Sequence, residues 1–362
     1  MRVLIVGAGI AGLALARALY QQGITADVVE RVAEWQPIGA GLYLPGNAVR
    51  ALSELGVGPA SAGANPIGRQ RILDHRGRLL ADIDLDRIWD GVGGCVAVHR
   101  ADLHKALRVE AAEVPIRLGT SVTHLENSRK PRVSFSDGSK GIYDLVVGAD
   151  GVHSTIRRVA MGGPPASYVG QLSWRFVVND FPARTDWTAM LGRGRTFLTV
   201  ALGGGIVYCY ADINTNDPAG ADSQDWRESF ADFADPVPRL LDQASGAYFA
   251  PIEEVLSPAW IAGHVVLVGD AAHATSPNMA QGAAMAVEDA LVLAETLAAD
   301  QPIDRALAGY EHRRKPRVAW VQEQTHRRDQ TRNLAPVVRN VTLRLAAERI
   351  FRSNYGPLRD LP

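Results

Sequence analysis

The sequence predicts an α/β fold in which a mostly parallel sheet carries helices, a mainly antiparallel sheet is inserted into it, and the C-terminal region is helical. A strand–turn–helix–strand pattern opens the chain at residues 3–30, strand-like runs dominate residues 167–213, and helical spacing dominates from Gln281 onward. A chain of 362 residues is long enough for two closely packed domains.

The first part of the chain alternates strands and helices. Residues 3–6 and 26–30 are apolar, strand-like runs on either side of a helical segment, residues 13–22, which stops at Gly23. Two strands joined by one helix lie parallel in a sheet. Beyond this unit we expect helices at residues 47–55 and 101–110, alternating strands between residues 70 and 83, and a hairpin formed by residues 132–135 and 140–147.

The middle of the chain changes character. Residues 172–178, 196–202 and 206–213 are predicted strands, and Gly203-Gly204-Gly205 suits the tight turn of a hairpin between the last two. Residues 265–268 then have the pattern of a buried parallel strand. We therefore expect the first sheet to be completed by a segment that follows the inserted antiparallel sheet.

Composition narrows the classes of function. The apolar fraction of 47% and the charged fraction of 21% are ordinary for a globular protein, and a net charge of −1 gives no overall field that attracts nucleic acid or a membrane. We interpret the basic runs at residues 312–315 and 326–328 as solvated helix faces. Because the sequence has no secretory signal and no long apolar run, we expect a cytoplasmic protein in which Cys95 and Cys209 are free thiols.

The most specific motif is Gly7-Ala8-Gly9-Ile10-Ala11-Gly12, at the turn between the first strand and the first helix. Gly7 permits the tight turn, Gly9 lets the backbone approach a pyrophosphate, and Gly12 lets the helix pack closely on the strand. Glu30 follows at the end of the second strand, where a carboxylate can bind ribose hydroxyls. The motif predicts a Rossmann-like site for a dinucleotide, either NAD or FAD.

Two further motifs follow strands later in the chain. Residues 148–157 come after an apolar run that ends at Val147, and on their own they also suit a strand-to-helix turn capped by Ser154. Gly269-Asp270-Ala271-Ala272-His273 follows residues 265–268 and leads into Pro277-Asn278-Met279-Ala280-Gln281-Gly282. An acidic residue at the carboxyl end of a parallel strand is typical of a ligand site at the edge of an α/β sheet.

These three motifs, in this order, resemble those of the single-component FAD-dependent aromatic hydroxylases (group A flavoprotein monooxygenases), such as the hydroxybenzoate, salicylate and urate hydroxylases. The resemblance spans nearly the whole chain. It implies a discontinuous FAD-binding domain (residues 1–70, 98–165 and 260–300), a β-sheet substrate domain (71–97 and 166–259) and C-terminal helices (301–362). The FAD-binding residues that it implies are Gly7, Gly9, Ala11, Gly12, Glu30, Arg31, Arg100, Val122, Asp150, Arg157, Asp270, Ala280, Gln281, Gly282 and Ala283.

The resemblance also gives some of these residues a place along the cofactor. The glycine motif and Glu30 would hold the ADP half, and Arg100 would lie near the pyrophosphate, although a surface arginine at a helix start would look the same in the sequence. Asp150 and Arg157 would be shared between FAD and the nicotinamide donor, and Asp270 would bind the ribityl or pyrophosphate region.

One position departs from the family pattern. Members often carry Pro-x-x-Gly-Gln-Gly at the third motif, and here Ala280 replaces the first glycine. This leaves the FAD assignment intact but the contacts to the flavin ring open. The helix that begins near Gln281 should direct its positive end at the flavin pyrimidine, which favours reduction by hydride.

The resemblance implies a reaction as well. NADH or NADPH would reduce FAD and leave, since the sequence has no second glycine fingerprint, and O2 would then form a flavin C4a-hydroperoxide that hydroxylates a small phenolic or heteroaromatic molecule. An epoxidase or natural-product tailoring oxygenase, a flavin dehydrogenase or reductase that does not activate oxygen, and a non-catalytic flavin protein remain alternatives. The sequence shows neither a metal site nor a catalytic triad, and it identifies no catalytic base; we interpret His153 and His273 as packing residues.

The substrate is expected between the flavin and the inserted sheet. Strand alternation places Tyr208 and Tyr210 on one face of the sheet, and Arg175 is a cation within an apolar strand that could meet an acidic or phenolic substrate. The alternative is a sheet-edge arginine and a core tyrosine pair. The C-terminal region has apolar residues at helical spacing, which could cap the fold or form a dimer contact, so we expect a monomer or homodimer: Val337, Val341, Leu345 and Ile350.

Overall fold

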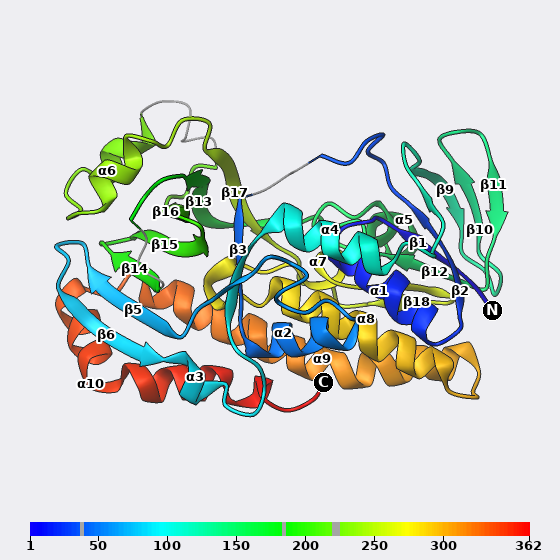
Figure 1. Cartoon of the computed structure of the whole chain (residues 1–362). Coiled ribbons are helices and arrows are strands. Elements are labelled where there is room, and N and C mark those ends of the chain that lie inside the picture. The colour runs from blue at the N-terminus through cyan, green and yellow to red at the C-terminus, as the bar shows by residue number, and fades with distance from the viewer. Residues whose placement is uncertain (37–39, 183–185, 219–224) are drawn as a thin grey trace.

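The computed structural model of the chain describes residues 1–36, 40–182, 186–218 and 225–362, and its first sheet is built from segments far apart in the sequence (Figure 1). The strand order is β18-β19-β12-β1-β2-β8. Strand β1 pairs in parallel with β2 and β12, and β12 pairs in parallel with β19, which confirms the prediction for residues 265–268. The strands are β1 Arg2–Val6, β2 Thr25–Val29, β8 Ile116–Arg117, β12 Leu145–Gly148, β18 Ile261–Ala262 and β19 Val265–Leu267.

The second large sheet has the order β17-β13-β16-β15-β14-β5-β6. Its pairs are antiparallel except that β14 lies parallel to β5. The predicted hairpin at Gly203-Gly204-Gly205 is confirmed, since all three glycines have positive φ. The strands are β5 Arg69–Asp74, β6 Leu79–Asp84, β13 Ser167–Val178, β14 Trp187–Leu191, β15 Arg195–Gly203, β16 Ile206–Asn214 and β17 Tyr248–Glu254.

Two small sheets complete the β structure. The predicted strand at residues 140–147 is divided, because Lys140–Ile142 pairs in the hairpin whereas Leu145–Gly148 is buried inside the first sheet. One small sheet has the order β11-β10-β9 and the other β3-β7-β4. Their strands are β9 Val122–Glu126, β10 Arg132–Phe135, β11 Lys140–Ile142, β3 Gly41–Leu44, β4 Asn65–Pro66 and β7 Val96–His99.

Helices cover the sheets and form the C-terminal region. Figure 1 shows α9 passing beneath both halves of the molecule and α10 lying along β6. None of the helices within the described ranges is long and apolar enough to cross a membrane. The helices are α1 Ile10–Gln21, α2 Gly46–Glu54, α3 Leu85–Ile88, α4 Arg100–Glu110, α5 Thr155–Met161, α6 Val237–Leu241, α7 Asp270–His273, α8 Gly282–Ala298, α9 Ile303–Thr331 and α10 Pro336–Tyr355, with 3₁₀ turns at Trp226–Phe230, Pro277–Met279 and Gly356–Leu358.

The two faces of the second sheet have different surroundings: one packs on a local hydrophobic core, and the other lines the cleft described below. Val207, Cys209 and Ala211 of β16 point into a local core with Phe176 and Phe230. The alternate residues of β16 point to the opposite face, which confirms the predicted separation of the tyrosines from Cys209. Cys95 and Cys209 are free and buried, as expected.

A buried ionic network ties α8 to α9 and corrects the prediction for the basic run at residues 312–315. Arg314 is 0% exposed rather than solvated. Its Nε donates to Asp289 Oδ1 at 2.7 Å and its guanidinium donates to Glu288 Oε2 at 2.7 Å. Arg314 is buried because residues four apart share one face of a helix, and Tyr310, Arg314 and Val318 all lie on the inward face of α9.

The same carboxylates reach the loops at the sheet edge. Asp289 Oδ2 accepts the backbone N–H of Gly269 at 2.9 Å and bonds His273 Nε2 at 2.6 Å. Burial alone would raise the pKa of Asp289, but His273 and Arg314 outweigh burial and hold its pKa below the ordinary value. The network therefore fixes the start of α7 and the body of α8 relative to each other.

We predict that Arg314→Leu destabilises the protein by about 3–5 kcal/mol, because it removes the fully buried cation that Glu288 and Asp289 share and leaves them only Arg317 and His273. Thermal or urea unfolding measures the loss. The matched control is Arg313→Leu: its side chain is 34% exposed and pairs with Glu295, so this change should cost less than about 1 kcal/mol. Equal losses in the two variants would contradict the assignment.

The network also predicts an acid response. The pKa values of Glu288 and Asp289 are lowered in the folded protein. Their stabilising contribution is therefore present above the ordinary carboxyl pKa of about 4 and is lost as the pH falls below it. Unfolding free energies measured from pH 6 downward should show this decline in the wild type.

Candidate functional site

A single cleft of about 1490 Å³ extends from the loop after β1 to the inner face of the second sheet. Its lining includes Gly7, Gly9 and Glu30 at one end and Trp187 and Tyr208 toward the other. The cleft thus brings residues of the first and third predicted motifs together with those of the expected substrate sheet.

The glycine loop has the geometry that its sequence predicts. Gly7 has φ of +104°, and a Cβ on Gly12 would lie 1.9 Å from the carbonyl oxygen of Gly7. A Cβ on Gly9 would meet no atom within 4 Å, so this position faces open space. Because α1 begins at Ile10, its free N–H groups lie beside that space, as an anion-binding helix start requires.

Glu30 is oriented by the same loop. Its Oε2 accepts the N–H of Ala8 at 2.8 Å and its Oε1 accepts the N–H of Val32 at 3.1 Å. Each oxygen keeps a second acceptor site for a ligand hydroxyl. Arg31 beside it is exposed, and Val122 at the start of β9 is half-buried; both line the cleft.

The second motif divides into a lining residue and a supporting residue. Asp150 lines the cleft and accepts the backbone N–H of Thr155 at 2.7 Å and the hydroxyl of Ser154, which caps α5. Burial raises the pKa of Asp150, and these hydrogen bonds oppose the rise. Arg157 does not line the cleft: its guanidinium donates to the carbonyls of Val152, Pro164 and Ala271. Arg157 is thus a positioning residue that joins α5 to α7.

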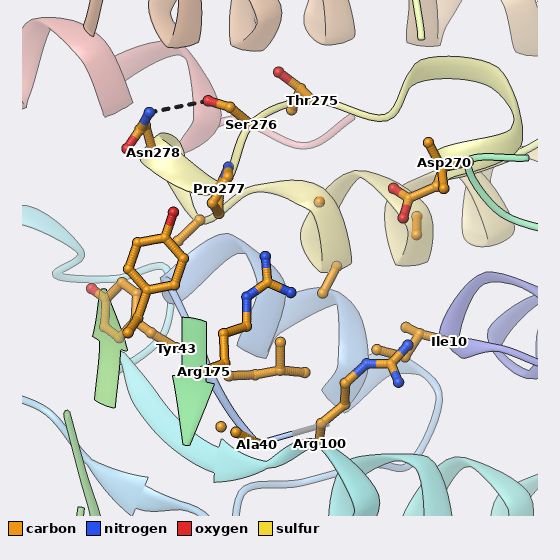
Figure 2. A pocket seen from close by; sticks show the side chains of 18 of the residues that line it. Ile10, Ala40, Tyr43, Arg100, Arg175, Asp270, Thr275, Ser276, Pro277 and Asn278 are labelled. Atoms are coloured by element: carbon orange, nitrogen blue, oxygen red, sulfur yellow. Dashed lines mark hydrogen bonds between the residues drawn. The ribbon is translucent and has the colours of Figure 1, made fainter. Parts of the chain in front are cut away.

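The third motif places a carboxylate in the cleft. Asp270 is exposed to the cleft, and desolvation by the protein atoms around the cleft raises the pKa of its carboxyl. Within the described ranges no hydrogen-bond donor contacts its carboxylate, which faces the open volume. The charge of Arg100 acts in the opposite direction on the pKa of Asp270, and Figure 2 shows Arg100 and Arg175 extending into the same space, with Asp270 and Pro277 across from them.

The loop before α8 is held in a strained form. Ala280 has φ of +50°, the left-handed conformation that the more usual glycine would adopt easily. Ala280, Gly282 and Ala283 line the cleft, whereas Gln281 is 1% exposed and donates to Asn47 Oδ1 at 3.2 Å behind it. Asn47 in turn donates to Glu288 at 3.0 Å, which links this loop to the buried network.

The substrate-side residues meet on one wall. Arg175, Tyr208 and Tyr210 line the cleft, and the Arg175 guanidinium lies 5.7 Å from the centre of the Tyr210 ring. Neither Arg175 nor the buried Tyr210 hydroxyl has a hydrogen-bond partner in the described part of the chain. Burial raises the pKa of Tyr208 to about 12 and also raises the pKa of Tyr210, so both hydroxyls stay protonated at neutral pH.

The two histidines differ. His273 is buried, packs against Trp260 and bonds Asp289, as expected of a packing residue. His153 is exposed at the cleft and lies 3.2 Å from Glu253, so the packing interpretation is wrong for it.

Sequence reasoning missed part of the wall. Trp187 lies on β14, a strand that the sequence pattern did not reveal, and Leu343, Ala347 and Phe351 come from α10. The strand β17 was missed as well, because Pro251 disfavours a strand and is tolerated here only at the sheet edge. The apolar positions noted on α10 (Val337, Val341, Leu345 and Ile350) are exposed, and Ile350 also lines the cleft.

Together, the parallel sheet, the glycine loop and the acidic residues after β2 and β19 define a dinucleotide-binding protein with a second sheet over the site. Comparison with known proteins specifies the class. The model of the family described as FAD binding domain matches residues 1–325. The chain belongs to this family, that of the FAD-dependent aromatic hydroxylases.

Relatives cover most of the chain. A 2-heptyl-3-hydroxy-4(1H)-quinolone synthase of Pseudomonas aeruginosa is 34% identical over 90% of this chain and 88% of its own length. An FAD-dependent urate hydroxylase of Klebsiella pneumoniae is 32% identical over 88% of this chain and 87% of its own. The crystal structure of Klebsiella pneumoniae HpxO with FAD and uric acid has a TM-score of 0.89 and 28% identity, covering 99% of this chain and 97% of that one.

We predict that Gly9→Ala leaves the FAD-free protein folded but weakens FAD binding by at least about tenfold, since the new methyl group enters the space for the phosphates. Flavin fluorescence titration measures the affinity. The matched comparison is Gly12→Ala, whose methyl group would collide with the Gly7 carbonyl and should prevent folding. Normal FAD affinity in Gly9→Ala would contradict the assignment of this loop.

We also predict that Ala280→Gly stabilises the protein by about 0.5–1 kcal/mol, because glycine relieves the left-handed strain. Ala283→Gly, in the first turn of α8, should instead destabilise it by about 0.5–1 kcal/mol. Unfolding curves of the two variants test the difference, and a shift of the same sign in both would refute it.

Proposed function

We propose that the chain is an FAD-dependent monooxygenase that uses NADH or NADPH and O2 to hydroxylate a small phenolic or heteroaromatic molecule. The observation that carries this proposal is the continuity of the cleft. One volume joins the glycine loop to an aromatic wall that carries Arg175, a cation with no hydrogen-bond partner among the described residues. The named relatives, which include a urate hydroxylase and a quinolone synthase, support the aromatic class of substrate.

The residues present fit FAD. The open position at Gly9 and the carboxylate of Glu30 suit the ADP half, because one admits phosphates and the other accepts ribose hydroxyl donors. Asp270 suits the middle of the cofactor, since its carboxylate is exposed to the cleft and accepts no hydrogen bond from the described part of the chain. Ala280 and Gly282 would lie at the pyrimidine edge, beside the start of α8.

Bound FAD supplies hydride acceptance from the nicotinamide and activation of O2. The chain supplies the environment. The positive end of α8, at Gly282 and Ala283, would stabilise negative charge on a flavin bound beside it, and the second sheet would help to exclude water. Arg175 would favour the anionic form of a phenolic or enolic substrate, and the Tyr210 ring lies beside its guanidinium at 5.7 Å.

The direct test is a panel of phenols and N-heteroaromatics assayed for NADH and NADPH oxidation, O2 uptake and product. We expect at least one compound to stimulate turnover and to gain one oxygen atom from labelled O2. Arg175→Gln should raise its KM by about tenfold and move the activity profile to higher pH, while FAD affinity stays unchanged. Arg239→Gln, at an exposed site, is the control.

Two outcomes would overturn the proposal. Oxidation of NADH or NADPH that no aromatic compound stimulates, with all O2 released as hydrogen peroxide, would indicate a reductase. An unchanged KM and pH profile in Arg175→Gln would remove the cation from substrate recognition.

A further inference from the structure

The cleft extends beyond the volume next to Arg175, into a compartment between the second sheet and α10. On the sheet side it is lined by residues of the four strands β5, β6, β14 and β15, and on the other side by one face of a helix. The sheet residues are Ile72, Ile83, Ala189, Leu191 and Leu198, and the helix residues are Leu343, Ala347 and Phe351. We call this the α10 compartment.

The charged groups at the α10 compartment already have partners. Arg339 donates to the Leu191 carbonyl at 3.1 Å and also to the Gly192 carbonyl. Arg332 forms an ion pair with the buried Asp212 and donates to Asn214 at 3.1 Å. These guanidinium groups hold the walls together: Arg332 is neutralised by Asp212, and Arg339 is hydrogen-bonded to carbonyl oxygens and to Asn340. Polar residues also line this part of the cleft: Gln70, Thr196 and Asp212 on the sheet side, and Thr342, Ser353 and Asn354 on the α10 side.

The helix that closes this compartment is anchored at both ends. Arg339 near its start bonds the end of β14, and the hydroxyl of Tyr355 near its end donates to the Met279 carbonyl at 3.2 Å. Arg328 of α9 lies over the Tyr355 ring at 5.2 Å. Because both ends are fixed, the walls stand apart around open volume instead of collapsing on each other.

We propose that the α10 compartment binds an apolar substituent, so that the substrate is an aromatic compound carrying an aliphatic chain of several carbons. This inference rests on the proposed function, since the ring would occupy the space beside Arg175. The walls are mostly apolar and suit an aliphatic chain, because each methylene that enters leaves water and gains contact. Binding should therefore strengthen by about fourfold for each added methylene until the compartment is full.

The test uses two homologous series, 4-alkylphenols and 2-alkyl-4-quinolones with chains of one to nine carbons, titrated into the FAD-loaded protein by calorimetry. We expect Kd to fall with chain length and then reach a plateau. Ala347→Phe and Ala189→Phe fill the compartment from opposite walls, so either one should abolish the gain from long chains and leave the Kd of the one-carbon compounds unchanged. With one variant on each wall, the test remains possible if one of the two proteins does not fold.

Ala346→Phe is the matched control, because Ala346 is the neighbouring residue on α10 and lies outside the cleft lining. It should keep the full chain-length dependence. A Kd that is independent of chain length in the wild type, or an equal loss for short and long chains in both filled variants, would overturn the inference. Either result can occur while short aromatic compounds are still hydroxylated, so it is distinguishable from failure of the proposed function.

Discussion

The carboxylate of Asp289 is the interaction on which the arrangement of the cleft depends. It lies at 0% exposure and accepts hydrogen bonds from a loop amide, a histidine and an arginine of a different helix. Such a buried charge is tolerated only where its partners are complete. Through Gly269 it sets the direction in which the next residue, Asp270, faces the cleft. Its neighbour on α8, Glu288, accepts a hydrogen bond from Asn47, and Asn47 also donates to Gln281. These contacts hold the loop that carries Ala280.

The second feature that shapes the cleft is the alternation of side chains along each strand of the inserted sheet, which sends every other residue to the same face. On β16 one set of alternate side chains fills a local core, and the other set, with Tyr208 and Tyr210, faces the cleft. The same alternation on β14 presents Trp187, Ala189 and Leu191. A helix from the far end of the chain then closes this wall. The cofactor end of the cleft thus follows from strand–loop–helix junctions, and the substrate end follows from a sheet face and α10.

The sequence predicted the features that depend on local backbone chemistry. The turn at Gly7, the acid after β2 and the hairpin at Gly203 all require particular residues at particular spacings. It did not predict β14, which pairs with the neighbouring β15 and with the distant β5, or the role of α10, whose contact with β6 joins segments more than 200 residues apart. Arg314 shows the reason most clearly. As part of a basic run it looked solvated, yet its helical phase among Tyr310 and Val318 places it in the core.

The most direct test of this account is the FAD affinity of Asp289→Asn, measured by flavin fluorescence in a variant whose folding has been checked by thermal melting. Asp289 does not line the cleft, so a residue without a positioning role would leave binding unchanged. The account predicts that the Kd for FAD rises by at least about tenfold, because the Gly269 loop and α8 lose their common anchor. A folded variant with the affinity of the wild type would contradict it.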